Sequence, residues 1–142
     1  MLVVDSSILI AYAIEDEPLH NLGRAKLVEW TQAGKKLAAP MLLRSELTSV
    51  VRRYVYLNAL SSDQGRVALE SLFKWSIVYH EDDQLMLEAY DIANEFNMPR
   101  AYDAQYLALT RRLSCELWTA DKRFYNVTNA RFADIHLLGD LS

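Results

Sequence analysis

The chain has 142 residues, 51% of them hydrophobic, and a formal net charge of −4 at pH 7. That length suits one hydrophobic core, so we expect a single domain over 1–142 rather than two. No apolar run approaches the ~20 residues of a transmembrane helix, and the negative charge argues against broad, nonspecific nucleic-acid binding.

The first residues of the chain combine a buried strand with a carboxylate. Leu2–Val4 is apolar and contains two valines, which is typical of a strand buried on both faces. Asp5 follows directly, and Ser6 and Ser7 are good N-cap residues for an apolar helix over 8–14. We therefore expect Asp5 at the carboxyl end of a central strand, where open α/β sheets bind ligands. On this stretch alone, simple helix capping explains Asp5 equally well.

The same alternation continues toward the middle of the chain. Apolar residues at helical spacing predict a helix from Leu19 that ends at Ala33–Gly34, followed by a short strand over Lys35–Pro40. A long amphipathic helix is then expected over Met41–Asn58. Glu46 lies in its second turn, on or beside the apolar face. A glutamate is by default a surface residue, but one this close to the core and soon after a strand is a candidate functional acid.

The central segment adds two helices and a strand. Helices are expected over Gln64–Lys74, after a Ser-Ser-Asp cap, and over Leu85–Phe96. Between them, Trp75–Tyr79 is less apolar than the other strands and is expected nearer the edge of the sheet. His80 follows that strand and is expected to face solvent.

Two further acids occupy positions like those above. Asp103 stands in the first turn of an apolar helix that follows Arg100, and Asp121 follows a buried strand over Cys115–Thr119. A short strand over Asp134–Leu138 completes the pattern. Alternating strands and helices predict a parallel sheet between two helix layers.

Parallel strands joined by right-handed crossovers end at one edge of a sheet, and that edge gathers Asp5, Glu46, Asp103 and Asp121. Four carboxylates without paired arginines repel one another, and a hard divalent cation such as Mg²⁺ or Mn²⁺ relieves that repulsion. A metal held in this way supports hydrolysis of a phosphodiester.

Four ordered segments, Val4–Ser7, Glu46 after Pro40, Tyr102–Ala108 and Thr119–Asp121, resemble the motifs of PIN-domain nucleases. The length resembles that of small bacterial or archaeal members, the VapC toxins of VapBC toxin–antitoxin pairs. The resemblance implies a three-layer α/β/α sandwich around a mainly parallel five-stranded sheet, and a Mg²⁺- or Mn²⁺-dependent endoribonuclease. The residues that it implicates are the metal-coordinating acids Asp5, Glu46, Asp103 and Asp121, with hydroxyls from Ser6, Ser7 and Thr119. Asn126 occupies a region where some relatives carry another acid, which leaves a second metal site open.

The resemblance also implies partners: an RNA substrate, a cognate antitoxin protein and a second copy of the chain. The number of large aromatic residues supports self-association independently, because one small core does not easily hold them all. The residues in question are Trp30, Tyr54, Tyr56, Trp75 and Tyr90. The single Cys115 excludes a disulfide framework. A strand at the start of the chain leaves no room for a signal peptide. We therefore expect a cytoplasmic protein with no membrane association.

Other function classes fit the residues less well. A phosphatase of the haloacid dehalogenase type needs a second aspartate two residues after the first, and Ser7 stands there. No glycine-rich phosphate-binding motif occurs, and three scattered histidines form no credible serine–histidine–acid set. The remaining alternative is a PIN-like module that binds RNA or protein without cutting. Retention of all four acids argues against it, since a groove that only binds RNA would bind it more tightly with fewer negative charges.

Overall fold

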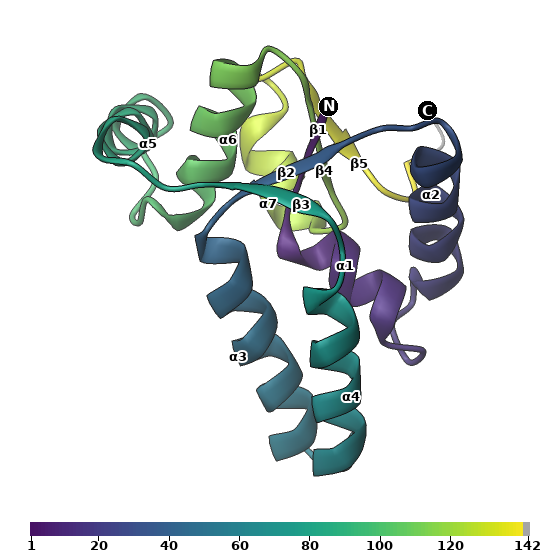
Figure 1. Cartoon of the computed structure of the whole chain (residues 1–142). Helices are drawn as coiled ribbons and strands as arrows, with labels where there is room; N and C mark the ends of the chain where they lie inside the picture. The colour runs from purple at the N-terminus through teal and green to yellow at the C-terminus, as the bar shows by residue number, and fades with distance from the viewer. Residues whose placement is uncertain (141–142) are drawn as a thin grey trace.

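The structure, a computed structural model, describes residues 1–140 and is built on a five-stranded parallel sheet (Figure 1). The strands lie in the order β3-β2-β1-β4-β5. Their bounds are β1 Leu2–Val4, β2 Leu37–Pro40, β3 Ile77–His80, β4 Glu116–Thr119 and β5 Ile135–Leu137. The first strand is central, since Val3 pairs with Ala38 on one side and Leu117 on the other. All of these side chains are fully buried, as expected for a strand covered on both faces.

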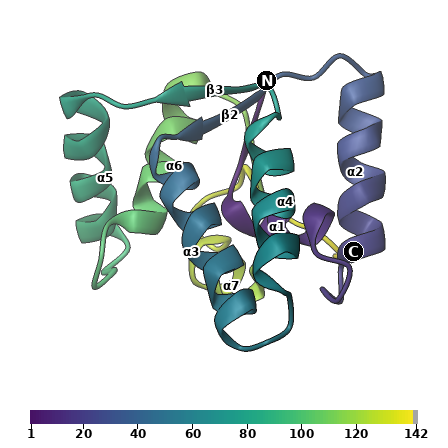
Figure 2. The same cartoon turned by 60° about the horizontal axis from the view of Figure 1, so that its bottom comes forward.

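Seven helices in the described residues flank the sheet. They are α1 Ser6–Ala13, α2 His20–Gln32, α3 Leu42–Tyr56, α4 Ser62–Phe73, α5 Asp83–Glu95, α6 Tyr102–Leu113 and α7 Lys122–Thr128. Helix α6 packs against β1, β2 and β4 and carries α5 beside it, while α1 and α2 pack together on the other side of the molecule (Figures 1 and 2). The predicted α/β/α architecture with a parallel five-stranded sheet is therefore confirmed.

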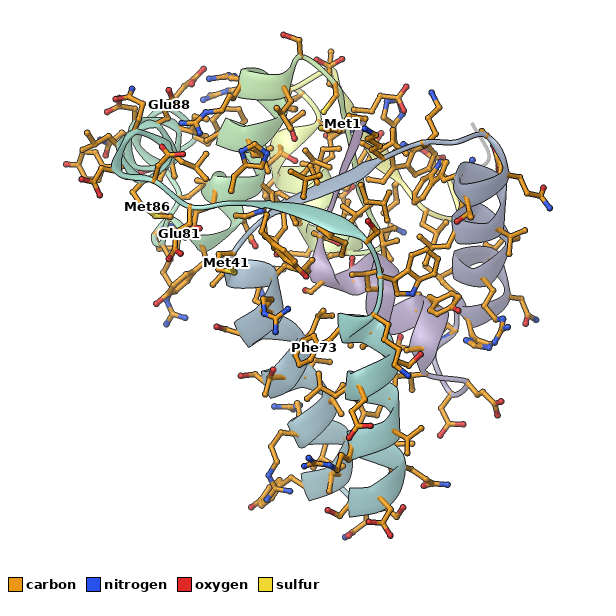
Figure 3. The ribbon with its side chains drawn as sticks, in the orientation of Figure 1. Met1, Met41, Phe73, Glu81, Met86 and Glu88 are labelled. Atoms are coloured by element: carbon orange, nitrogen blue, oxygen red, sulfur yellow. The ribbon has the colours of Figure 1, made fainter. Side chains whose placement is uncertain are left out.

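Helices α3 and α4 form an antiparallel pair that projects away from the sheet (Figure 1). Gly65 allows their close approach, because a Cβ at this position would lie 2.5 Å from Val55 Cγ2. Nearer the sheet, the Arg44 guanidinium of α3 lies 4.4 Å from the ring centre of Phe73, which is labelled on α4 in Figure 3. The start of α3, which carries Glu46, is thus held in place by the sheet and by α4.

Some elements differ from the sequence-based expectations. Helix α7 was not predicted; Asp121 caps it by accepting hydrogen bonds from the backbone N–H groups of Arg123 and Phe124. Trp75 lies before β3 and packs edge-on against Tyr12, with ring centroids 5.2 Å apart. The expectation for His80 was wrong: the side chain is half-buried, because it lies at the end of β3 where α3 begins. Among the described residues, no helix has the length and apolar character needed to cross a bilayer.

Candidate metal centre

The four predicted acids lie at the carboxyl edge of the sheet. Asp5 directly follows β1, and Asp121 follows the adjacent β4, which pairs with β1 up to Val4 and Trp118. Glu46 comes from the second turn of α3 and Asp103 from the first turn of α6. A groove of about 880 Å³ is lined by Glu46, Asp103 and Asp121, while Asp5 lies buried.

A network of hydroxyl groups holds the buried Asp5 carboxylate. Its Oδ1 accepts hydrogen bonds from the Ser7 backbone N–H at 3.1 Å and from Ser7 Oγ at 2.5 Å. Its Oδ2 accepts from Thr119 Oγ1 at 2.5 Å. Each hydroxyl also accepts a backbone N–H from the segment after β4: Ser7 Oγ from Ala120 and Thr119 Oγ1 from Asp121. The ends of β1 and β4, and with them Asp5 and Asp121, are thereby fixed relative to each other.

The three hydroxyl residues predicted from the sequence do not behave alike. Ser7 and Thr119 contact Asp5 directly, and their oxygens lie 3.2 Å apart. Ser6 lines a second groove that also reaches Asp121, but within the described part of the chain its side chain forms no hydrogen bond. Because Ser6 is the first residue of α1 and Ser7 the second, only Ser7 turns back toward the capping carboxylate.

The Thr119 hydroxyl has a testable energetic role. We expect Thr119→Val to lower the free energy of unfolding by about 2 kcal/mol, because it leaves one oxygen of the buried Asp5 carboxylate without a donor. The matched control is Thr110→Val, which removes an equally buried hydroxyl that only bonds the Tyr106 carbonyl within α6. Urea titration measures both. Equal losses in the two variants would contradict a special role for Thr119.

Glu46 is oriented by an aromatic hydroxyl that sequence reasoning did not single out. The Tyr106 hydroxyl donates a hydrogen bond to Glu46 Oε1, and the ring of Tyr106 is 1% exposed. Tyr106 follows Asp103 by three positions on α6, so both residues lie on the same side of that helix. That spacing was the available signal. Burial and the neighbouring Glu46 charge raise the pKa of Tyr106 well above its ordinary value, so it remains a donor.

The acids also interact through their charges. The pKa of Asp5 is raised from 3.8 to about 7, mainly by burial and in smaller part by the charges of Asp121 and Glu46, while its Ser7 and Thr119 hydrogen bonds lower it. Burial and the Asp103 charge raise the pKa of Glu46, although its Tyr106 hydrogen bond opposes them. Desolvation by the surrounding groove, together with the Asp121 charge, raises the pKa of Asp103. Asp5, Glu46 and Asp103 thus each respond to the charge of at least one other acid. None of the four acids is paired with a cationic side chain in the described residues.

The donor set matches a hard divalent cation by its chemistry. All four groups are carboxylates, and such oxygens are the ligands that Mg²⁺ and Mn²⁺ prefer. In the arrangement described for 1–140, however, no three acidic, histidine or cysteine side chains are placed to share one ion. Among the described residues, Asp103 is exposed and makes no side-chain hydrogen bond, so it can adjust by side-chain rotation. Asp5 is held by Ser7 and Thr119, and Asp121 Oδ1 is held by the backbone N–H groups of Arg123 and Phe124. The residues thus fit a metal through their chemistry and their shared edge, and Asp103 is the acid that no hydrogen bond holds in the described residues.

Comparison with known proteins identifies the family. The model of the PIN domain matches residues 2–130. The chain belongs to the PIN domain family. It is 30% identical to Ribonuclease VapC9 of Mycobacterium tuberculosis, over 92% of this chain and 94% of that one. The predicted family, its VapC-like character and the ribonuclease class of enzyme are thus confirmed.

Solved structures support the fold of this PIN domain. A toxin–antitoxin complex from Klebsiella pneumoniae matches with a TM-score of 0.68 at 16% identity, covering 99% of this chain and 100% of that one. VapC20 of Mycobacterium tuberculosis, described as a sarcin–ricin loop cleaving toxin, also has a TM-score of 0.68, at 14% identity, covering 93% and 96%. At these identities the likeness concerns the fold alone.

Proposed function

We propose that this PIN domain is a Mg²⁺- or Mn²⁺-dependent endoribonuclease whose metal site consists of Asp5, Glu46, Asp103 and Asp121. The observation that carries the proposal is the convergence of the four acids at one edge of the sheet, unpaired and electrostatically coupled. The relationship to Ribonuclease VapC9 supports RNA as the substrate. Purified protein should cut a labelled RNA with Mg²⁺ or Mn²⁺ and not with EDTA. Cleavage that persists in EDTA would contradict the metal-dependent reaction.

Within this reaction the residues of the chain have distinct tasks. A bound divalent cation would supply activation of water and stabilisation of charge on the attacked phosphate. Asp5 provides a rigid carboxylate, since Ser7 and Thr119 hold it by hydrogen bonds. Tyr106 keeps Glu46 turned toward the groove. Asp103, which is exposed in the groove, can adjust to the ion by side-chain rotation, whereas Asp121 keeps Oδ1 on the start of α7 and has Oδ2 for the ion.

Metal should stabilise the fold, because it relieves repulsion among the acids. At a free metal concentration about ten times the dissociation constant, linkage gives about 1.4 kcal/mol. We expect the melting temperature of the wild type to rise with added Mn²⁺ or Mg²⁺, and that of the Asp5→Asn/Asp103→Asn double variant to respond much less. Calorimetry measures both shifts. Equal shifts in the two proteins would refute a shared site.

We further propose that the protein is the toxin of a toxin–antitoxin pair and that a cognate antitoxin restrains it. The relationship to Ribonuclease VapC9 supports this role. A small neighbouring reading frame with a DNA-binding pattern should encode the partner, whose product should bind this protein and inhibit cleavage. We also propose a cytoplasmic location, because the single cysteine is consistent with a reducing compartment. We propose a single domain over 1–142.

We propose self-association through α5. Of the aromatic residues expected to exceed the core, Trp30 is buried and Tyr54 and Trp75 are half-buried, whereas Tyr56 and Tyr90 are exposed. Tyr90 belongs to a contiguous apolar surface on α5, with Met86 and Leu87 (Met86 is labelled in Figure 3). Such patches usually mark interfaces.

Light scattering at tens of micromolar should report a dimer of the 16.3 kDa chain, and Leu87→Asp/Tyr90→Asp should convert it to monomer. The reason is that two charges would then be buried in the contact. A wild type that is monomeric at this concentration would refute self-association, and a dimer insensitive to these changes would place the contact elsewhere.

A further inference from the structure

One wall of the acidic groove carries an exposed aromatic ring. Tyr102, the residue before Asp103, is 56% exposed and lines the groove together with Met98 and Phe96 from the loop between α5 and α6. Within residues 1–140 its hydroxyl makes no hydrogen bond and its ring stacks on no other. Tyr102 therefore offers an unstacked aromatic ring beside the acids.

Two arginines line the same groove without a partner. The guanidinium groups of Arg100 and Arg123 form no ion pair or hydrogen bond in the described structure, although Glu46, Asp103 and Asp121 lie in that groove. The arginines toward the end of α6 differ, since Arg111 pairs with Glu95 and Arg112 with Asp82. Unpaired guanidinium groups are suited to phosphate, which they contact with two parallel hydrogen bonds.

The other side of the metal centre lacks these features. A second groove meets the first at Asp121 and follows α1 and the segment after it, with Ser6, Ser7, Ile10 and Glu17 among its lining residues. It contains no arginine or lysine, and its one further charge, that of Glu17, is negative. A polyanion crossing the metal centre would therefore meet favourable contacts on the α5–α6 side and few on the α1 side.

We propose that this enzyme binds its RNA mainly on one side of the cleaved phosphodiester, the side that lies toward α5 and α6. There Tyr102 stacks on a base, and Arg100 and Arg123 bind the adjoining phosphates. An unstacked base finds a flat aromatic partner in Tyr102, and base–aromatic stacking is sequence-tolerant. The arginines offset the negative charge of the acids on this side only. The inference rests on the proposed ribonuclease function and assigns its substrate-positioning residues.

Variants at Tyr102 test the stacking. Tyr102→Leu should raise KM roughly ten-fold, while kcat changes less than two-fold, because the ring positions RNA and touches no reacting group. Tyr102→Phe should keep the KM of the wild type, because the face of the ring, and not the hydroxyl, stacks on the base. The matched control is Tyr56→Leu on α3, an exposed tyrosine outside both the groove and the α5 surface. An unchanged KM in Tyr102→Leu would overturn the assignment.

Variants at the arginines test the phosphate contacts by salt dependence. Fluorescence anisotropy in an Asp5→Asn background measures binding of a labelled RNA without cutting. Arg100→Gln and Arg123→Gln should each reduce the slope of log K against log salt by about 0.7, the value for one phosphate contact on a single strand. Arg53→Gln, an exposed arginine on α3 outside the groove, should leave the slope unchanged. Slopes equal to that of the control would remove the arginines from the proposal.

Shortened RNAs test the asymmetry. Removing nucleotides from one side of the cleaved bond should raise KM about ten-fold, and removing them from the other side less than two-fold. In Tyr102→Leu the larger penalty should shrink, since the contact is already lost. Equal penalties on both sides, or an unaltered penalty in Tyr102→Leu, would overturn the inference. If wild type binds RNA without cutting, the proposed function fails while the binding comparison still decides this inference; if wild type does not bind, both fail.

Discussion

Asp103→Asn is expected to lose at least about a hundred-fold in metal-dependent RNA cleavage while remaining folded. The substitution keeps the shape of the side chain but removes a negative oxygen ligand, so metal affinity and catalysis fall together. Folding should survive, because the neutral asparagine costs less to desolvate and removes the repulsion with Asp121, the two effects that raise the pKa of Asp103. RNA binding should hold or tighten, since one negative charge fewer faces the phosphates.

The control for Asp103→Asn is Glu88→Gln on α5, labelled in Figure 3. Glu88 accepts a hydrogen bond from Gln84 and lies 3.7 Å from an Arg112 nitrogen at the surface, and it does not line the acidic groove. The Glu88→Gln variant should therefore cut RNA as fast as the wild type. Circular dichroism confirms the folding of each protein. A folded Asp103→Asn that cuts at the wild-type rate would misplace the active site, whereas a wild type that binds RNA but never cuts it would favour the binding-module alternative.

In the metal-free protein, stability should fall as pH rises from about 4 to above 7. Burial, opposed by its hydrogen bonds, raises the pKa of Asp5 from 3.8 to about 7, so in this window the folded state holds a proton that the unfolded state has released. The difference between the two pKa values corresponds to about 4 kcal/mol at most. The raised pKa values of Glu46 and Asp103 act in the same direction. Protonation of Asp82 affects stability only at more acidic pH, because the hydrogen bond from Arg112 lowers the pKa of Asp82 to about 2.

Urea unfolding in EDTA at pH 5 and pH 8 measures this difference. Wild type should be several kcal/mol more stable at pH 5, and Asp5→Asn should lose most of the dependence, because its side chain has no proton to release. Saturating Mg²⁺ should reverse the trend for wild type, since metal binds the deprotonated acids. A metal-free wild type that is as stable at pH 8 as at pH 5 would show that Asp5 is not buried as the structure describes.

The positions of Asp5 and Asp121 were predictable because they depend on local pattern. Each follows a buried strand, and parallel strands that pair must end at a shared edge. The sequence predicts that Glu46 and Asp103 lie in early turns of their helices. It does not predict how far they lie from the other acids, because that distance depends on how α3 and α6 pack on the sheet. The Asp5 network likewise needs residues separated by 114 positions, Asp5 and Thr119, whose meeting is a property of the folded chain.

Other features lay beyond sequence reasoning for identifiable reasons. Helix α7 is only seven residues long, so its buried Phe124 and Thr128 provide too few repeats to reveal a helical period. Asp121 was considered as a ligand and not as the cap of that helix, although it serves as the cap in the structure. The unpaired state of Arg100 and Arg123 is a fact of side-chain placement and leaves no trace in the sequence.

The most direct test is one titration that follows both Mn²⁺ binding and RNA cleavage. Free Mn²⁺ is counted by electron paramagnetic resonance while the same samples cut a labelled RNA. If Asp5, Glu46, Asp103 and Asp121 hold the catalytic metal, bound Mn²⁺ and cleavage rate will rise with the same midpoint, and the Asp5→Asn/Asp103→Asn variant will show neither. Cleavage at full rate before Mn²⁺ binds, or undiminished binding and cleavage in that variant, would contradict the account.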